Sequence, residues 1–141
     1  MKKVIAIVLA VLCVMAAAGC SSKNMTFNIG AASKINIKSG LTGDEINIAD
    51  DGFIKDITGN INFLRFEKTS STDGKVGYAY MLTWYDADNT QIACVTITDE
   101  NGYQISHDGY YYKVGADLNI DMESIAEMLN IALSSSPAPG A

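Results

Sequence analysis

The chain's single histidine, His107, stands between a hydroxyl and a carboxylate in the segment Ser106-His107-Asp108-Gly109. The same three groups form the triad of serine hydrolases, in which the imidazole takes the proton of the attacking hydroxyl. Triad members converge from separate parts of a chain, whereas adjacent residues on a turn point apart. The segment therefore predicts a polar turn. The alternative is a small envelope hydrolase that uses His107 with Asp108 or with a distant acid.

The cysteines are Cys13, Cys20 and Cys94, and only Cys94 lies in the body of the chain. It stands between the apolar residues Ile92 and Val95, and free cysteine is among the most buried residue types. We therefore expect a buried strand thiol at Cys94, the alternative being a reactive one. No histidine or cysteine pair has the spacing of a zinc site. We predict neither a metal nor a cofactor.

Two short motifs have part of the pattern of ion-binding and phosphate-binding loops. The segment that starts with Asp86 and Asp88 opens like a calcium loop, but Gln91 stands at the glycine position and Ile97 at the position of the closing glutamate. Residues 40–43 contain two glycines without the lysine of a P-loop. We predict hairpin turns at both places. Because no paired catalytic groups are found, we also predict that the protein is not an enzyme.

Aromatic residues gather on two expected strands. Tyr78, Tyr80 and Trp84 share one face of the first strand, and Tyr110 and Tyr112 share one face of the second, because alternate residues of a strand point the same way. One interpretation is cross-strand aromatic packing beneath helices. The other is an exposed platform that binds a glycan, a peptide or a partner strand.

The first 20 residues have the pattern of an export signal. Lys2 and Lys3 precede an uncharged apolar run at residues 4–18, which is short for a membrane-spanning helix of about 20 residues and fits a secretory signal. The segment Ala17-Ala18-Gly19-Cys20 resembles the bacterial lipobox, with Ala17 where leucine is commonest. The resemblance implies cleavage between Gly19 and Cys20 and a diacylglycerol on the sulfur of Cys20. The alternatives are an ordinary signal peptide and a retained single-span anchor.

Charge and anchor together define the expected location. Loss of Lys2 and Lys3 with the leader leaves eight basic and 16 acidic residues. No basic patch is visible, so we expect no nucleic-acid partner. Anionic headgroups should repel so acidic a domain, which leaves the lipid as the source of membrane affinity. We expect the extracytoplasmic face of the cell membrane, or the outer membrane if the source is Gram-negative.

Periodicity predicts an α+β fold with one antiparallel meander sheet of about five to seven strands and two packed helices, the second C-terminal. One helix follows an N-cap at Asp50 and the other an N-cap at Asp121. Strands are expected at residues 26–29, 34–38, 45–49, 64–68, 76–85, 91–98, 103–106 and 110–114. The expected organisation is a signal peptide at 1–19, a lipidated tether at 20–25, a single domain at 26–133 and a disordered tail at 134–141.

The mature domain resembles small uncharacterised extracytoplasmic domains of Gram-positive lipoproteins. The resemblance lies in Ile46-Asn47-Ile48, Leu82-Thr83-Trp84-Tyr85-Asp86 and Gly109-Tyr110-Tyr111-Tyr112-Lys113-Val114. It implies no activity and no catalytic residues. We therefore expect a non-catalytic binding or accessory module whose partner is an envelope protein, peptide or glycan. A further alternative is a sensor or inhibitor domain that regulates a membrane protein.

Overall fold

The computed structural model describes residues 24–74, 77–115 and 118–135 of the 141-residue chain, and within them eight strands form one antiparallel sheet. The predicted α+β class and the two helices are confirmed, but the sheet has eight strands and not five to seven. The strands are β1 (Asn24–Met25), β2 (Lys34–Ser39), β3 (Glu45–Ile48), β4 (Phe66–Ser71), β5 (Tyr80–Tyr85), β6 (Gln91–Ile97), β7 (Gln104–His107) and β8 (Tyr110–Val114). The helices are α2 (Asp51–Phe63) and α3 (Met122–Ser135).

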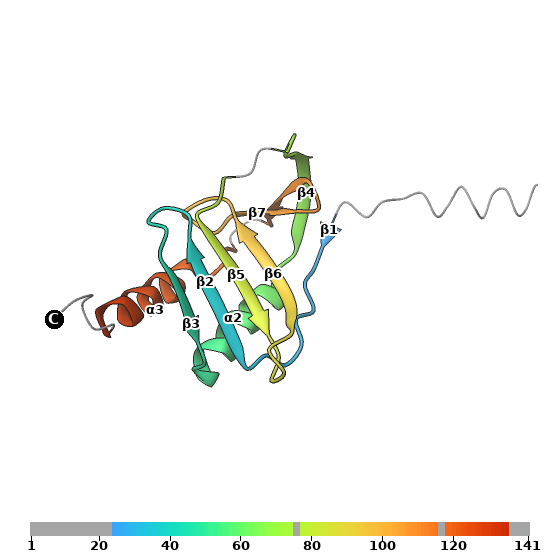
Figure 1. Cartoon of the computed structure of the whole chain (residues 1–141). Helices are drawn as coiled ribbons and strands as arrows, with labels where there is room; N and C mark the ends of the chain where they lie inside the picture. Colours follow the sequence, from blue (N-terminus) through green and yellow to red (C-terminus); the bar gives the residue numbers. More distant parts are fainter. Residues whose placement is uncertain (1–23, 75–76, 116–117, 136–141) are drawn as a thin grey trace, which may run out of the picture.

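The order across the sheet is β1-β4-β8-β7-β6-β5-β2-β3, so that β1 and β3 form its two edges. Strands β5 to β8 follow one another as the expected meander, and the β2–β3 hairpin joins it through β5. Figure 1 shows α2 crossing behind the sheet and α3 beside β3. The described helices therefore leave the opposite face of the sheet without a helical cover.

Alternation along the strands places the core on the helix-covered face. Ile35 and Ile37 of β2, and Leu82 and Trp84 of β5, are completely buried, and the residues between them point to the other face. The buried residues of α2, which are Phe53, Ile54, Ile57 and Ile61, join the same core. Trp84 Nε1 donates a hydrogen bond of 2.8 Å to Thr58 Oγ1 of α2, which ties the centre of the sheet to that helix.

Both helices begin at the predicted N-caps. Asp50 Oδ1 accepts a hydrogen bond of 2.7 Å from Phe53 N, and Asp121 Oδ1 accepts one of 3.1 Å from Ser124 N. Helix α3 buries Ile125 and Leu129, but Leu133 is 39% exposed. The helix therefore packs only through its first part, and its last turns pass beyond the edge of the sheet (Figure 1).

The predicted strand at 26–29 is wrong, because the strand lies two residues earlier in β1 and residues 26–33 have no strand structure. The cause is a side chain distant in sequence. Asn62 Oδ1 accepts a hydrogen bond of 2.8 Å from Ile29 N, and Asn62 Nδ2 donates one of 3.0 Å to Ile29 O. These bonds occupy the backbone groups of Ile29 that a sheet would use, and they hold the segment against α2.

Other boundaries differ from the prediction. The strand expected at 76–85 starts at Tyr80, and the one expected at 64–68 starts at Phe66, after the helix cap at Leu64. Helix α3 continues through Ser135, two residues into the expected tail. The predicted signal peptide, Gly19 and Cys20 lie outside the described residues. Within the described ranges no helix is long and apolar enough to cross a membrane.

Candidate functional site

Strands β6 and β7 pair along only part of the length of β6. Strand β6 has seven residues, but it pairs with β7 only at Thr96↔Ser106 and Ile97↔Ile105. The preceding residues 91–95, called here the free half of β6, pair with β5 alone among the described residues. A strand with one unpaired side presents a row of backbone donors and acceptors that can pair with another strand.

The early turn after β7 creates this free half. Asp108 and Gly109 have φ angles of 46° and 78°, the positive values that a two-residue type I′ hairpin turn requires. Because β7 ends at His107, the chain turns into β8 before it reaches the level of Cys94. A register shift between Trp84 and Tyr85 adds a bulge at Ile92, whose side chain is 39% exposed.

The backbone alternation of β6 sets which groups face the gap. Thr98 N donates a hydrogen bond of 3.0 Å to Gln104 O across to the β7 side. Alternate residues of an antiparallel strand bond to the same neighbour, so the backbone groups of Thr96 and Cys94 face this side as well. Strand β7 pairs with Thr96. Cys94 is the first position at which the backbone N–H and C=O groups on this side have no strand beside them.

A hollow of about 390 Å³ lies at this gap and brings together two residues that the sequence had singled out separately. Its lining consists of Thr72, Cys94, Thr96, Ser106, His107, Asp108 and Gly109. Cys94 is half-buried, and its Sγ accepts a hydrogen bond of 3.8 Å from Thr83 Oγ1. The expected fully buried thiol is therefore a partly accessible one at the wall of a hollow.

His107 is held at the rim of this hollow by its neighbours. Its ring packs edge-on against Phe27, with the centroids 5.9 Å apart, and against Tyr112 at 6.4 Å. Its Nε2 lies 3.3 Å from Asp108 Oδ2, with the two side chains 38% and 85% exposed. So exposed a pair contributes little to stability. The contacts orient the imidazole but leave part of it open to solvent.

The geometry does not assemble a triad from the described residues. Ser106 and His107 are consecutive residues of β7, so their side chains point to opposite faces. No hydrogen bond joins His107 to Cys94 or to Ser106 in the part of the chain that the structure describes. The same part holds no cluster of three metal-ligating side chains. The hollow thus offers hydroxyls, a thiol and an imidazole for contact with a ligand.

The five aromatic residues predicted as a binding surface do not form one. Trp84 is completely buried and Tyr112 is 9% exposed, because both belong to the core, where Trp84 meets α2 and Tyr112 meets the ring of His107. Tyr80 packs against the core, and Tyr110 carries the Lys68 ammonium 3.2 Å above its ring centroid. The platform hypothesis is therefore wrong for Trp84 and Tyr112, and cross-strand and helix packing accounts for them.

Tyr78 lies apart from these residues, in a polar hollow of about 590 Å³ near the β2–β3 turn. The lining residues are Leu41, Gly77, Tyr78, Ala79, Thr98, Asp99, Glu100, Asn101, Gln104 and Tyr111. The Asp99 carboxylate accepts hydrogen bonds from Gln104 N at 2.7 Å and from Tyr103 N at 3.3 Å. Those bonds form the turn between β6 and β7, so the carboxylate that lines the hollow has a structural role.

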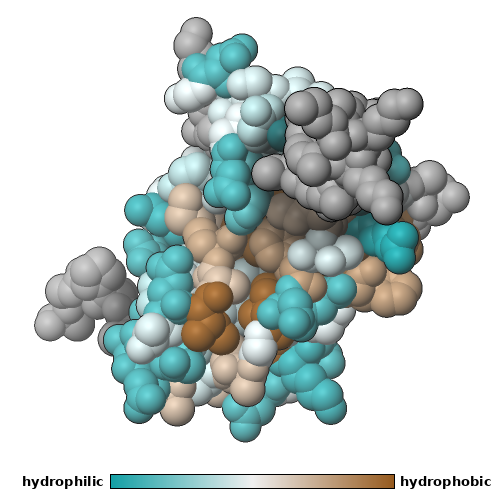
Figure 2. All heavy atoms as spheres, turned by 90° about the vertical axis from the view of Figure 1, so that its right-hand side faces the viewer, coloured by the Kyte–Doolittle hydropathy of each residue, from teal (hydrophilic) through white to brown (hydrophobic). Residues whose placement is uncertain are grey.

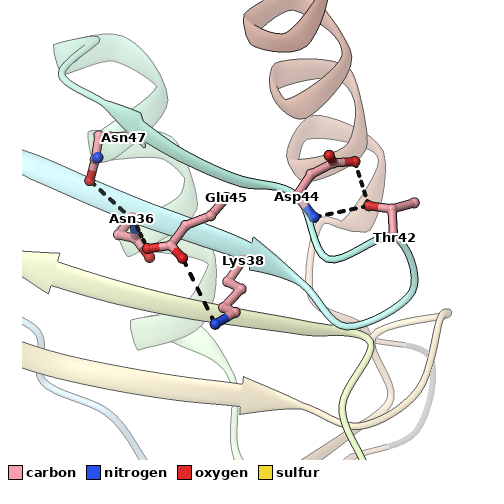
Figure 3. A network of polar contacts seen from close by, with 6 residues as sticks. All are labelled: Asn36, Lys38, Thr42, Asp44, Glu45 and Asn47. Atoms are coloured by element: carbon pink, nitrogen blue, oxygen red, sulfur yellow. Dashed lines mark hydrogen bonds and ion pairs between the residues drawn. The ribbon is translucent and has the colours of Figure 1, made fainter.

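The outer edge at β3 differs in character from the free half of β6. Figure 3 shows its polar network: Asn36 Nδ2 donates to Glu45 Oε1 at 3.0 Å and to Asn47 Oδ1 at 3.2 Å, and Lys38 Nζ lies 3.8 Å from Glu45 Oε2. Charged side chains on an edge strand discourage pairing with other chains. The free half of β6, in contrast, carries Gln91, Ile92, Ala93, Cys94 and Val95, none of them charged.

Sequence reasoning missed the free half of β6. The signal was the mismatch between an eight-residue expected strand at 91–98 and a four-residue partner at 103–106. Strands of unequal length leave part of the longer one unpaired unless a third strand covers it.

Comparisons with protein-family models, with curated proteins and with solved structures give no match.

Proposed function

We propose that this chain is a lipid-anchored extracytoplasmic binding module and that it binds an extended segment of an envelope protein along the free half of β6. The observation that carries the proposal is the pairing of a seven-residue strand with β7 at two positions only. An extended peptide that adds to a sheet edge gains main-chain hydrogen bonds, and neighbouring hollows select its side chains. The hollow beside Cys94 and His107 is placed for that selection.

The chemistry of the free half suggests the kind of segment that fits. The side chains there are uncharged, Ile92 is exposed, and the hollow offers the hydroxyls of Thr96 and Ser106. A short strand with small or polar residues facing the hollow and one apolar residue beside Ile92 matches these features. If the partner is a membrane protein that the domain regulates, the same contact serves the sensor or inhibitor role.

The anchor part of the proposal rests on the lipobox resemblance at Cys20. A lipid on this cysteine keeps the domain beside the membrane, where partners in the envelope are concentrated. Labelling cells with an alkyne fatty acid should mark the wild-type protein and not the Cys20→Ala variant, which should also leave the membrane fraction. Labelling of the Cys20→Ala protein would contradict the assignment of that cysteine.

Site-specific photocrosslinking tests the strand contact. A photoreactive residue at Ile92 should capture one dominant envelope protein, and the same residue at Asn47 on β3 should not. With the photoreactive residue kept at position 92, Gln91→Lys should lower that capture several-fold, because a charge on an edge disfavours an added strand. Asn47→Lys is the matched control and should leave capture unchanged. Equal capture from both edges, or capture insensitive to Gln91→Lys, would reject the site.

A hydrolase that uses His107 is the second candidate, and the Asp108 carboxylate 3.3 Å from His107 Nε2 favours it. The imidazole would be a general base toward a bound water and not toward the thiol, because Cys94 alternates with Thr96, the partner of Ser106, and so lies on the face opposite to His107. His107→Ala should then abolish turnover of peptide or ester substrates, and Cys94→Ala should leave it unchanged. Turnover that survives His107→Ala would exclude this candidate.

A further inference from the structure

An apolar cluster on another part of the surface is far more exposed than its residue types normally are. Phe63, the last residue of α2, is 74% exposed, and Leu118 is 43% exposed. Together with Arg65 and Gly115 they line a hollow of about 450 Å³. A phenylalanine buries a large apolar area wherever it can, so an exposed one beside a second apolar residue marks a contact surface. We call these residues the Phe63–Leu118 cluster.

The cluster lies close to the point where the described chain begins. In β1, Met25 pairs with Phe66, the residue after Arg65, and Gly115 N donates a hydrogen bond of 3.3 Å to Arg65 O. Four residue steps separate Asn24 from Cys20, a distance of at most about 14 Å in an extended chain. An anchor at Cys20 therefore keeps β1 and its partner β4 near the bilayer, while the antiparallel register directs the chain end away from Arg65 and toward Lys68.

The side of the molecule that carries β1 has an apolar centre (Figure 2). Figure 2 looks onto the side of the molecule that carries β1 in Figure 1, and it shows apolar residues in the middle of that face with hydrophilic residues around them. Ordinary solvent-facing surfaces mix the two kinds more evenly. A bilayer interface, in contrast, accommodates an apolar centre with a polar rim.

Arg65 brings a basic group into the cluster, although the chain as a whole is acidic. The formal net charge is −6, but Arg65 adjoins β4, Lys68 lies on β4, and Lys113 lies on β8 paired with Glu67. A basic residue close to anionic lipid contributes about 1 kcal/mol. The expectation that anionic headgroups repel the domain treats the charge of the domain as uniform. The basic residues near β1 make the charge there less negative than the average.

We propose that the Phe63–Leu118 cluster seats on the surface of an anionic bilayer, with Phe63 and Leu118 entering the interface and Arg65 binding lipid phosphate. This inference rests on the lipid anchor of the proposed function. Seating turns the anchored domain from a freely rotating body into one with a fixed face toward the membrane. The guanidinium is suited to the contact because its planar fork binds phosphate oxygens in pairs.

Quenching of tryptophan fluorescence by brominated lipid tests the seating directly. The lipidated protein, purified from membranes, is placed in vesicles of phosphatidylcholine and phosphatidylglycerol with bromines on the acyl chains. The added indole of Phe63→Trp should be strongly quenched relative to unbrominated vesicles, so that the total emission of the two tryptophans falls by up to about half. The wild-type protein should stay unquenched, because its single tryptophan, Trp84, has no exposed surface. Ile131→Trp, at a 53% exposed site on α3, is the matched control and should also stay unquenched.

Two further results separate the orientation from the anchor. Arg65→Glu added to Phe63→Trp should reduce the quenching, and Arg65→Lys should largely keep it. A protein that floats with the vesicles and carries lipid on Cys20 by mass spectrometry, yet shows no quenching of Phe63→Trp, would overturn the seating alone. A protein without lipid on Cys20 would overturn the anchor, and the seating with it.

Discussion

The hydrogen bond from Trp84 to Thr58 gives the sharpest test of how the sheet is fastened to α2. Trp84 is completely buried, and its Nε1 donates to Thr58 Oγ1 at 2.8 Å. Thr58→Val removes the acceptor and keeps the shape and the helix propensity nearly unchanged. The indole N–H is then left unpaired in the core, which costs about 1–3 kcal/mol. Because Thr58 is half-buried and water can reach it in part, we expect the lower half of that range, about 1–2 kcal/mol.

Equilibrium urea unfolding followed by circular dichroism measures this loss. With an m-value of about 1–2 kcal/mol/M for a domain of this size, the midpoint should fall by roughly 1 M. Thr58→Ser keeps the hydroxyl and is the first control. The second is a double-mutant cycle: in a Trp84→Phe background the N–H is absent, and Thr58→Val should then have almost no effect.

A Thr58→Val midpoint equal to the wild type would refute the reasoning, because it would mean that the buried indole N–H needs no acceptor from α2. An equally large loss in the Trp84→Phe background would refute it differently. That result would assign the loss to helix α2 itself and not to its bond with the sheet.

The remaining predictions concern three local contacts. Asp50→Ala should lower the free energy of unfolding by about 1 kcal/mol through the loss of the N-cap, and Asp50→Asn should lose less; thermal or urea melts decide, and an unchanged melt for Asp50→Ala would contradict the cap. Gly102→Ala should destabilise the domain far more than Gly109→Ala. Both glycines have positive φ, but a Cβ at Gly102 would come within 2.7 Å of Ile120 O, whereas nothing lies within 4 Å of a Cβ at Gly109. Equal losses of stability would show that the backbone angle alone sets the effect. Asn62→Ala should speed hydrogen exchange at Ile29 by more than tenfold without unfolding the sheet, and unchanged exchange there would reject the role of Asn62.

Local chemistry explains why many elements could be predicted. The caps at Asp50 and Asp121 depend on a side chain three residues from its partner, and the alternation of Ile35 and Ile37 is set within one strand. The segment at residues 26–29 alternates in the same way, yet it is not a strand. A side chain 33 residues away binds its backbone, and no pattern within the segment can signal that.

The candidate site was hidden for the same reason. Cys94 and His107 were each interpreted from their own neighbours in sequence, as a strand thiol and a turn residue. Their shared hollow exists because β7 stops before β6 is fully paired, which is a property of three strands together. The aromatic residues show the reverse case: alternation correctly put Trp84 on one face, but the position of α2 decided that this face is the buried one.

The bond between Asn62 and Ile29 also has a mechanical consequence for a protein held at Cys20, as we propose. A pull on the anchor acts first on β1, whose ladder with β4 has only two residue pairs. Release of residues 24–28 lengthens the leash by about 17 Å, until the load reaches the two hydrogen bonds at Ile29. This release also breaks the packing of Met25 and Phe27 on the core. The tether thus has a reserve length and a stop, and the domain can follow a partner away from the membrane before the rest of its core bears the load.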